Sequence, residues 1–580
     1  MGVLTTVEAQ CKDCYKCVRA CPVKAIKINT GHAQIWEERC ILDGCCISVC
    51  PQNAKRVRAD LPSVRARIAQ GAVLAASIAP SYIAAFDIPT AGHLVAALRK
   101  LGFTYVTETA IGAEIVAHAH KACMEGRSSP VVTSSCPAIV NLVEQHYPEA
   151  IPYLAPIVSP MIAHGSMLHQ QYGASVEVIF IGPCVAKKAE AAEAQFAGVI
   201  SNVLTFQELE QWLAQENIRP EELAPEVYDT VDTNWGRSFP LAGGLLRTAG
   251  LSTDVLASRM ATITGIEESE SVIRQLIAGV DLSLDLIEML ACEGGCVDGP
   301  CMVGPWEGIA RRQRLIHHVK EAGQGLADSY QGSFKWADDD GQALPWLRRT
   351  YTDRKLRLSE PSEEELQQIL AAIGKRTPQD ELNCGACGYD SCRDKARAVY
   401  QGVAENEMCI PHMRAKAESL ANVIIETTPN GIIVVDDNLL ILAINPAAEV
   451  MFGCLAQDLL HQPLTKLIDA HGFERVLGNR QLLKDIAEYP SHDIIVRQYV
   501  FAPENQDIII GIFTDITEDQ DRQDELARLK ATTLERAQDV INRQMRVAQE
   551  IAGLLGETTA ETKVLLSQLM TLMQNGDETP

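Results

Sequence analysis

The residues in this chain best suited to chemistry are cysteines in loops rich in glycine and proline. Three short stretches carry them: TSSCP at 133–137, GPCVAKK at 182–188 and EMLACEGGCVDGPC at 288–301. Thiolates supplied by several loops are the usual ligands of a 4Fe–4S cluster, whereas unrelated buried thiols are the alternative interpretation. The sequence therefore predicts one cluster with four cysteine ligands. These ligands would be Cys136, Cys184, Cys292 and Cys296.

The N-terminal segment has a second cysteine pattern, which is typical of ferredoxins. CKDCYKCVRACP at 11–22 has the C-x2-C-x2-C-x3-C-P spacing that binds 4Fe–4S clusters, and CILDGCCISVCP at 40–51 is an imperfect copy. One cluster would be held by Cys11, Cys14, Cys17 and Cys50. The other would be held by Cys21, Cys40 and Cys46, completed by Asp43 or by the extra thiol of Cys45. A carboxylate is a hard ligand for such a soft site, and zinc is the competing occupant of any cysteine quartet.

A third cysteine group lies further along the chain. NCGACGYDSC begins at residue 383, and a later cysteine completes a C-x2-C-x4-C-x16-C pattern. This pattern resembles a small 4Fe–4S domain of anaerobic redox proteins, with a structural zinc site as the alternative. The ligands would be Cys384, Cys387, Cys392 and Cys409.

Composition limits the classes of protein to which the chain can belong. It has 580 residues, which predicts several domains, and a net charge of −24, which disfavours direct binding to nucleic acid. The sequence contains no uninterrupted apolar run of about 20 residues, so no membrane span is expected. The N-terminus has no signal-peptide pattern. Because the 19 cysteines follow cluster spacings, we expect a reducing, cytoplasmic location.

The elements that must position the first four cysteines alternate between strand and helix patterns. Buried strands are expected within 71–86, 103–109, 130–137 and 176–184, and helices at 91–101 and 113–123. This alternation predicts an α/β domain with a parallel sheet. Two of the cysteine loops then follow strand ends, where such folds bind ligands.

The C-terminal part has a different character. Residues 321–360 are polar and are expected to form a linker, 417–518 resemble an α+β PAS domain, and an amphipathic helical region follows. The predicted organisation is multidomain α/β. It comprises a ferredoxin-type domain at 1–58, an α/β domain at 59–345, a small 4Fe–4S domain at 360–415, a PAS domain at 416–518 and C-terminal signalling helices at 519–580.

The three cysteine loops of the α/β domain resemble the three signatures of the FeFe-hydrogenase catalytic domain. The resemblance implies an H-cluster, in which a 4Fe–4S cube is bridged through Cys296 to a diiron subsite with CO, cyanide and a bridging dithiolate. It also implies that Lys187 hydrogen-bonds one cyanide, and that Ser81, in the segment Ala79-Pro80-Ser81, contacts the other.

Several residues depart from the hydrogenase pattern. Ser135 stands where productive members carry a cysteine that relays protons, and a hydroxyl is far less acidic than a thiol. Ala119 and His120 occupy the positions of relay glutamates, and Leu290 replaces a methionine beside the cluster. This variant pattern resembles the sensory FeFe-hydrogenases.

The resemblance therefore implies a hydrogen-sensing enzyme from an anaerobe, with low activity. It would bind H2 and split it slowly and reversibly, exchange electrons with a redox partner such as ferredoxin, and relay its state through the PAS domain and helices to a downstream signalling protein. The C-terminal helices are expected to pair with a partner protein or with a second copy of the chain, in a homodimer. The alternatives are a metabolic hydrogenase with high turnover and a non-hydrogenase iron–sulfur protein of the same superfamily without the diiron subsite.

Overall fold

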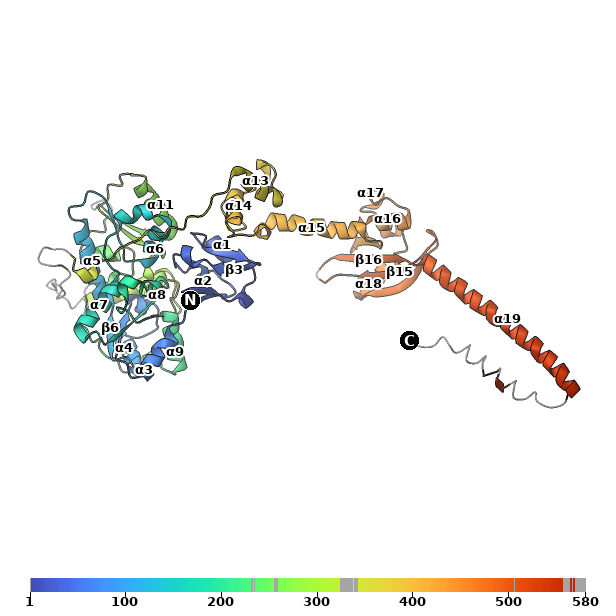
Figure 1. Cartoon of the computed structure of the whole chain (residues 1–580), viewed down its shortest axis with the longest axis horizontal. Coiled ribbons are helices and arrows are strands. Elements are labelled where there is room, and N and C mark those ends of the chain that lie inside the picture. Colours follow the sequence, from blue (N-terminus) through green and yellow to red (C-terminus); the bar gives the residue numbers. More distant parts are fainter. Residues whose placement is uncertain are drawn as a thin grey trace. The chain divides into compact units, whose positions relative to one another are not determined.

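The computed structural model describes residues 2–230, 233, 235–254, 259–323, 337, 343–504, 506–555, 564, 565, 567 and 568. The chain forms two compact units, Met1–Met413 and Arg414–Pro580. Figure 1 shows their elements, coloured along the sequence. Not one described helix combines the length and the apolar character that crossing a membrane requires.

The N-terminal domain is a small α+β fold. Strand β1 (Leu4–Thr6) pairs antiparallel with β4 (Lys55–Val57), and β2 (Ile26–Asn29) pairs with β3 (His32–Ile35). One short helix lies within each cysteine run: α1 (Lys16–Ala20) in the first and α2 (Cys45–Ser48) in the second. These elements bring the two runs together on an apolar core that continues into the α/β domain and the small domain.

The α/β domain contains a four-stranded parallel sheet in the order β6-β5-β8-β9. Its strands are β5 (Leu74–Ile78), β6 (Tyr105–Glu108), β8 (Glu177–Gly182) and β9 (Asn202–Thr205). Every residue of β5 is buried, as expected for a parallel strand covered on both faces. The surrounding helices are α3 (Leu61–Ala69), α4 (Ala91–Leu101), α5 (Ala110–Met124), α7 (Pro160–Tyr172) and α9 (Phe206–Gln215).

A second parallel sheet, in the order β10-β11-β7, lies in the same domain. It contains β7 (Val131–Val132), β10 (Met260–Thr264) and β11 (Leu286–Leu290). In chain order, α11 (Ile266–Ile277) lies between β10 and β11, and α12 (Ile309–Gly323) follows β11. The strand predicted within 130–137 therefore pairs with β11, through Val131 with Leu286. Since β7 and β11 run in parallel, the loops that follow them leave the same sheet edge.

The polar segment expected to be a linker is partly built into the domain. Leu347 is fully buried, and Arg349, which is 3% exposed, forms ion pairs with Glu190 and Glu193. The expectation of a free linker is therefore wrong for this stretch, because polarity alone did not indicate buried ion pairs. Residues 324–336 and 338–342 lie outside the described residues.

The small domain that follows contains α13 (Glu363–Ala372) and α14 (Cys392–Tyr400), and α15 (Ile410–Thr427) begins directly after it. Ser362 begins α13 with a capping box, in which its hydroxyl accepts from the Glu365 N–H.

The second unit has an antiparallel sheet in the order β13-β12-β16-β15-β14. The strands are β12 (Gly431–Asp436), β13 (Ile441–Ile444), β14 (Leu483–Tyr489), β15 (Ile494–Phe501) and β16 (Ile508–Asp515), with helices α16 (Pro446–Phe452), α17 (Ala456–Leu459) and α18 (His471–Asn479). Phe452, Phe473 and Phe513 pack in its core. Helix α19 (Thr517–Leu555) follows, and most of the predicted C-terminal region beyond it lies outside the described residues. The predicted multidomain fold class is confirmed.

Candidate metal centre

The loops of the two parallel sheets carry the four cysteines of the α/β domain. Cys136 caps α6 (Pro137–His146) just after β7, and Cys184 lies between β8 and the short helix α8 (Ala186–Glu190). Cys292 and Cys296 follow β11. Gly295, with φ 102°, lies so close to the Pro240 carbonyl that a side chain would collide with it. Glycine is therefore required where this loop turns back.

All four thiols line one cavity. The cavity also includes Ser135 and Lys187, and Leu42 and Asp43 reach it from the N-terminal domain. Three distant stretches therefore converge on one volume lined by cysteine sulfur. That these four thiols hold a single 4Fe–4S cube stays a prediction.

Thiolate ligands in this cavity would need a compensating positive charge. Burial, with a smaller contribution from the neighbouring Cys136, raises the pKa of Cys184 to about 11. Burial and the neighbouring cysteines also raise the pKa values of Cys292 and Cys296. Four buried thiolates would repel one another without a compensating positive charge, and iron ions would supply it.

A second cavity adjoins the first and shares residues with it. Cys184, Lys187 and Cys296 line both cavities, so the geometry alone does not single out one bridging thiolate. Ala79, Pro80 and Ser81 line only the second. A two-part cofactor attached to a cysteine therefore has a volume for each part.

Two hydroxyls in the second cavity have unused hydrogen-bonding capacity. Ser81 Oγ and Ser135 Oγ are buried and have no hydrogen-bond partner among the described residues. Buried polar groups in folded proteins are normally paired. These hydroxyls therefore fit a polar ligand in the cavity, which is what a diiron subsite with cyanide ligands would provide.

Lys187 lies at the junction of the two cavities and is anchored by a carboxylate. Its Nζ donates to Glu190 Oε2 at 2.8 Å. Glu190 also accepts from Ser159 Oγ at 2.9 Å and from Arg349 Nη1 at 2.9 Å. Sequence reasoning missed Glu190, although its i, i+3 spacing from Lys187 is a signal for a helical pair. The sequence did not indicate that Arg349 would pair with Glu190, because Arg349 lies in a distant segment of the chain.

His120 has a structural role in the loop that carries Ser135. Its Nδ1 lies 2.8 Å from the Val116 carbonyl oxygen, and its Nε2 lies 3.1 Å from Ser134 Oγ. Burial lowers the pKa of His120 to about 4, so the ring is neutral near pH 7. Ala119 beside it is fully buried. Neither residue supplies an acid–base group in place of the expected glutamates.

The imperfect ferredoxin run leaves two candidates for its fourth ligand. Burial raises the pKa of Asp43. Burial also raises the pKa of Cys45, and the negative charge of the neighbouring Asp43 adds to this rise. The Cys45 thiol lies 3.3 Å from the Ala20 carbonyl oxygen. Burial also raises the pKa of Cys21 to about 11 and that of Cys40 to about 12. Both candidates lie among the predicted ligands, so the choice between them stays a prediction.

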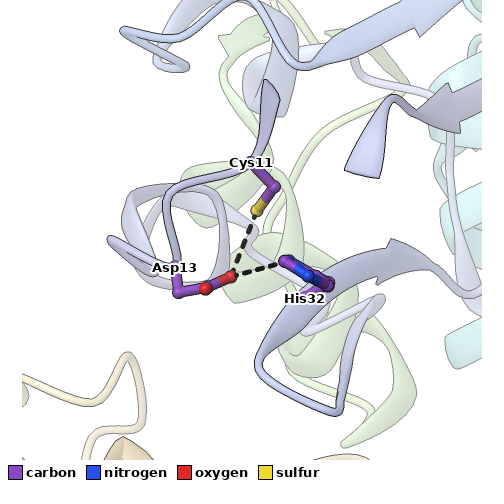
Figure 2. Close-up of side chains that lie close together, drawn as sticks. All are labelled: Cys11, Asp13 and His32. Atoms are coloured by element: carbon purple, nitrogen blue, oxygen red, sulfur yellow. Dashed lines mark hydrogen bonds and ion pairs between the residues drawn. The ribbon is translucent and has the colours of Figure 1, made fainter. Parts of the chain in front are cut away.

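A side-chain group around Cys11 escaped sequence reasoning. Cys11 Sγ donates to Asp13 Oδ1 at 3.5 Å, and His32 Nδ1 lies 3.1 Å from the same oxygen. Figure 2 shows the three side chains turned toward one another. The three side chains are close enough to hold one metal ion. His32 comes from β3, so no local spacing predicted its proximity. The group includes a predicted cluster ligand, and it is therefore part of the ferredoxin-type site.

The third cysteine group also encloses one volume. Cys384, Cys387, Cys392 and Cys409 all line a cavity between the end of α13, the start of α14 and the start of α15. Lys395 lines it as well, and its Nζ donates to the Asn406 carbonyl oxygen at 3.1 Å. Burial lowers the pKa of Lys395, and nearby cysteines oppose this effect.

Comparisons with known families agree with this arrangement. Residues 72–300 match the iron-only hydrogenase large subunit, C-terminal domain. Residues 33–56 match a 4Fe–4S binding domain, 380–411 a putative Fe–S cluster domain and 420–485 the PAS fold.

Individual relatives are distant. The NADP-reducing hydrogenase subunit HndD of Solidesulfovibrio fructosivorans is 24% identical over 57% of this chain, and the match spans 63% of its own length. The periplasmic [Fe] hydrogenase large subunit of Nitratidesulfovibrio vulgaris is 27% identical over 53% of this chain and 89% of its own. The cytosolic Fe–S cluster assembly factor NAR1 of Yarrowia lipolytica is 24% identical over 53% of this chain and 76% of its own.

Among solved structures, apo [FeFe]-hydrogenase HydA1 from Chlamydomonas reinhardtii aligns with 52% of this chain and all of its own, at 20% identity and a TM-score of 0.43. The family matches and the order of the domains along the chain lead to one identification. The chain carries the C-terminal domain of an FeFe-hydrogenase large subunit, together with a 4Fe–4S ferredoxin domain, a further iron–sulfur domain and a PAS domain.

Proposed function

We propose that this chain is a hydrogen-sensing FeFe-hydrogenase of low turnover. The observation that carries the proposal is the pair of adjoining cavities, one lined by four cysteines and the other by Ser81 and Ser135 with unpaired hydroxyls. When bound, the H-cluster would supply a site where H2 binds and is split heterolytically. Cys136, Cys184, Cys292 and Cys296 would hold it.

The chain's own residues would orient the cofactor and exclude water. Lys187 would direct its ammonium group to a cyanide while Glu190 holds the lysine in place. Ala79, Pro80, Met161 and Phe180 give the second cavity apolar walls. Ser135 would donate a hydrogen bond there, but its hydroxyl is too weak an acid to move protons quickly near neutral pH.

The ferredoxin-type and small domains would carry electrons between the catalytic centre and a redox partner such as ferredoxin, in a reducing cytoplasm. The redox state would then bias the geometry of the PAS domain and α19, as any two-state switch requires. Leu526 and Leu529 on α19 are 57% and 58% exposed. These apolar side chains support pairing with a second copy or with a downstream signalling protein.

Two other functions compete with this proposal. The similarity to a cytosolic Fe–S cluster assembly factor favours an iron–sulfur protein without the diiron subsite. The similarity to HndD favours a metabolic hydrogenase with high turnover. The unpaired Ser81 and Ser135 hydroxyls argue against the first alternative, and serine at position 135 argues against the second.

One experiment separates the three functions. The infrared spectrum of protein matured with the diiron subsite is compared with that of protein prepared without it, and hydrogen oxidation is measured on both. Bands of CO and cyanide together with slow oxidation are expected. A spectrum without these bands would favour the non-hydrogenase alternative, and rates like those of metabolic hydrogenases would overturn the sensory assignment.

A further inference from the structure

The small domain contacts the N-terminal domain, and the cysteine loops of the two domains meet at this interface. Arg19, on α1, donates from Nη1 to the Ala386 carbonyl oxygen at 2.9 Å and from Nη2 to the Cys14 carbonyl oxygen at 3.0 Å. Cys14 is a predicted ferredoxin-type ligand, and Ala386 lies between two predicted ligands of the small domain. One planar guanidinium therefore fixes two cysteine loops relative to each other.

The two backbones also approach closely beside Arg19. Gly388 has a φ of 94°, and a Cβ atom placed on it would lie 2.8 Å from Val18 Cγ1 and 3.1 Å from the Arg19 nitrogen. A larger residue at this position would both strain the backbone and push the domains apart. The contact therefore depends on a glycine placed next to Cys387.

Further contacts extend the interface away from the cysteine loops. The Ile28 N–H donates to the Val403 carbonyl oxygen at 2.9 Å. The Glu405 carboxylate accepts from the N–H groups of Thr30 at 2.7 Å and Gly31 at 3.2 Å. The two domains therefore meet in a fixed orientation.

Tyr389 occupies the buried part of this interface. It is 5% exposed and shares an apolar core with Cys21 and Val403. Its hydroxyl has no hydrogen-bond partner in the described part of the chain. Burial raises the pKa of Tyr389, and Cys387 and Cys21 contribute to the same effect. The ring is thus close to predicted ligands of both domains.

The N-terminal domain also reaches the four-cysteine cavity, which Leu42 and Asp43 line. Within the described chain, by contrast, that cavity has no lining residue from 384–409. The N-terminal domain therefore contacts both the catalytic cavity and the small domain.

We propose that the small domain exchanges electrons with the N-terminal domain through this interface, and that Arg19 is the positioning residue that keeps the two cysteine loops at a fixed separation. One electron would leave a reduced iron–sulfur centre held by one domain and be taken up by an oxidised centre held by the other, and no covalent bond would form or break. The small domain is then the end of the route that starts at the catalytic cavity. This inference rests on the proposed function only for the direction of electron flow.

The test uses the full chain without the diiron subsite, reconstituted anaerobically with iron and sulfide and reduced with dithionite. Electron paramagnetic resonance then reports magnetic interaction between reduced centres. A Cys384→Ser/Cys387→Ser double variant identifies the signal of the small domain. Arg19→Ala and Gly388→Val disturb the interface in two different ways. Arg56→Ala is the matched control, because Arg56 contacts Gln10 within the N-terminal domain.

Wild-type protein and Arg56→Ala are expected to show broadened, interacting signals. Both interface variants should lose the part of the interaction that the Cys384→Ser/Cys387→Ser double variant also lacks, while their iron content per chain stays unchanged. A wild-type spectrum equal to the sum of the double-variant spectrum and an isolated small-domain centre would overturn the proposal, and so would persistence of that part of the interaction in both interface variants. Because the protein used in this test is prepared without the diiron subsite, a failure of the hydrogen-sensing proposal would not alter the result.

Discussion

Asp43 of the N-terminal domain and Cys292 of the third cysteine loop line the same cavity. The two loops also approach closely next to Asp43, since a Cβ atom placed on Gly44 would lie 2.5 Å from Pro300 Cγ. The imperfect ferredoxin run therefore packs directly against the loop that carries Cys292 and Cys296. Asp43 is placed where it would affect both centres.

Asp43→Ala is expected to perturb the N-terminal cluster that Cys21, Cys40 and Cys46 would hold. A carboxylate binds iron more weakly than a thiolate at such a soft site. If Asp43 is the ligand, wild-type protein should show an unusual spin state or convert readily to a three-iron form. Electron paramagnetic resonance and iron analysis of both proteins check this.

Cys45→Ala is the matched control, because the Cys45 thiol lies in the same loop. Its cluster should resemble that of the wild type. An unaffected cluster in Asp43→Ala together with a damaged one in Cys45→Ala would transfer the ligand role to Cys45.

Changing Cys184 or Cys292 to serine is expected to abolish assembly of the H-cluster. Both thiols line the shared cavity, and a serine hydroxyl is a poor iron ligand at neutral pH. The measurement is the infrared spectrum after maturation. Cys123→Ser is a suitable control, since Cys123 lies on α5 and is absent from the residues that line either cavity. A complete set of CO and cyanide bands in Cys292→Ser would show that the ligand assignment is wrong.

Glu288 should make the stability of the α/β domain depend on pH. Its side chain accepts from the Leu245 N–H at 3.0 Å and from Thr262 Oγ1 at 3.2 Å, and burial raises its pKa from 4.5 to about 7. A raised carboxyl pKa means that the folded state binds the proton more tightly. The resulting stabilisation is complete below pH 4.5 and is lost as the pH rises through about 7.

Glu288→Gln keeps the hydrogen-bonding shape and removes this titration. At pH 8 the variant should be more stable than the wild type by up to about 3 kcal/mol. Urea midpoints of the α/β domain measured from pH 5 to pH 8 test this, with the exposed Glu267→Gln as control. Equal pH slopes in wild type and Glu288→Gln would refute the prediction.

Local patterns in the sequence were enough to predict the fold class and the cysteine groups. The strand pattern before Cys184 and the helix pattern at 91–101 correspond to β8 and α4. Such patterns are informative because spacing and periodicity reflect ligand geometry and burial directly.

Features built from distant segments could not be predicted in this way. The strand pattern around Val131 indicated a parallel strand but not that it would pair with β11 in a separate sheet. The pairing of Glu190 with Arg349 and the contact of Arg19 with Ala386 likewise join remote parts of the chain. Each depends on tertiary packing, which has no local periodicity.

Ser135→Cys tests the expectation of slow turnover. Ser135 lines both cavities, and its hydroxyl has no hydrogen-bond partner among the described residues. A thiol has a pKa near 8.5 and can give and accept a proton near neutral pH, whereas a hydroxyl cannot do so readily. A positioned general acid or base typically accelerates a reaction about 10²–10⁴-fold. The variant should therefore turn hydrogen over faster than the wild type.

The rise should be smaller than that full range, because the next step of the relay is also altered. Ala119 has no acid–base group, and the neutral His120 is bonded to the Ser134 loop. Hydrogen oxidation and evolution are measured on both proteins, with the H-cluster content of each determined by infrared spectroscopy. Ser135→Ala is the control for the change in volume and should stay at or below the wild-type rate. An unchanged rate in Ser135→Cys at equal cluster content would mean that proton transfer at this position does not limit turnover, and wild-type rates as high as those of metabolic hydrogenases would contradict the sensory role.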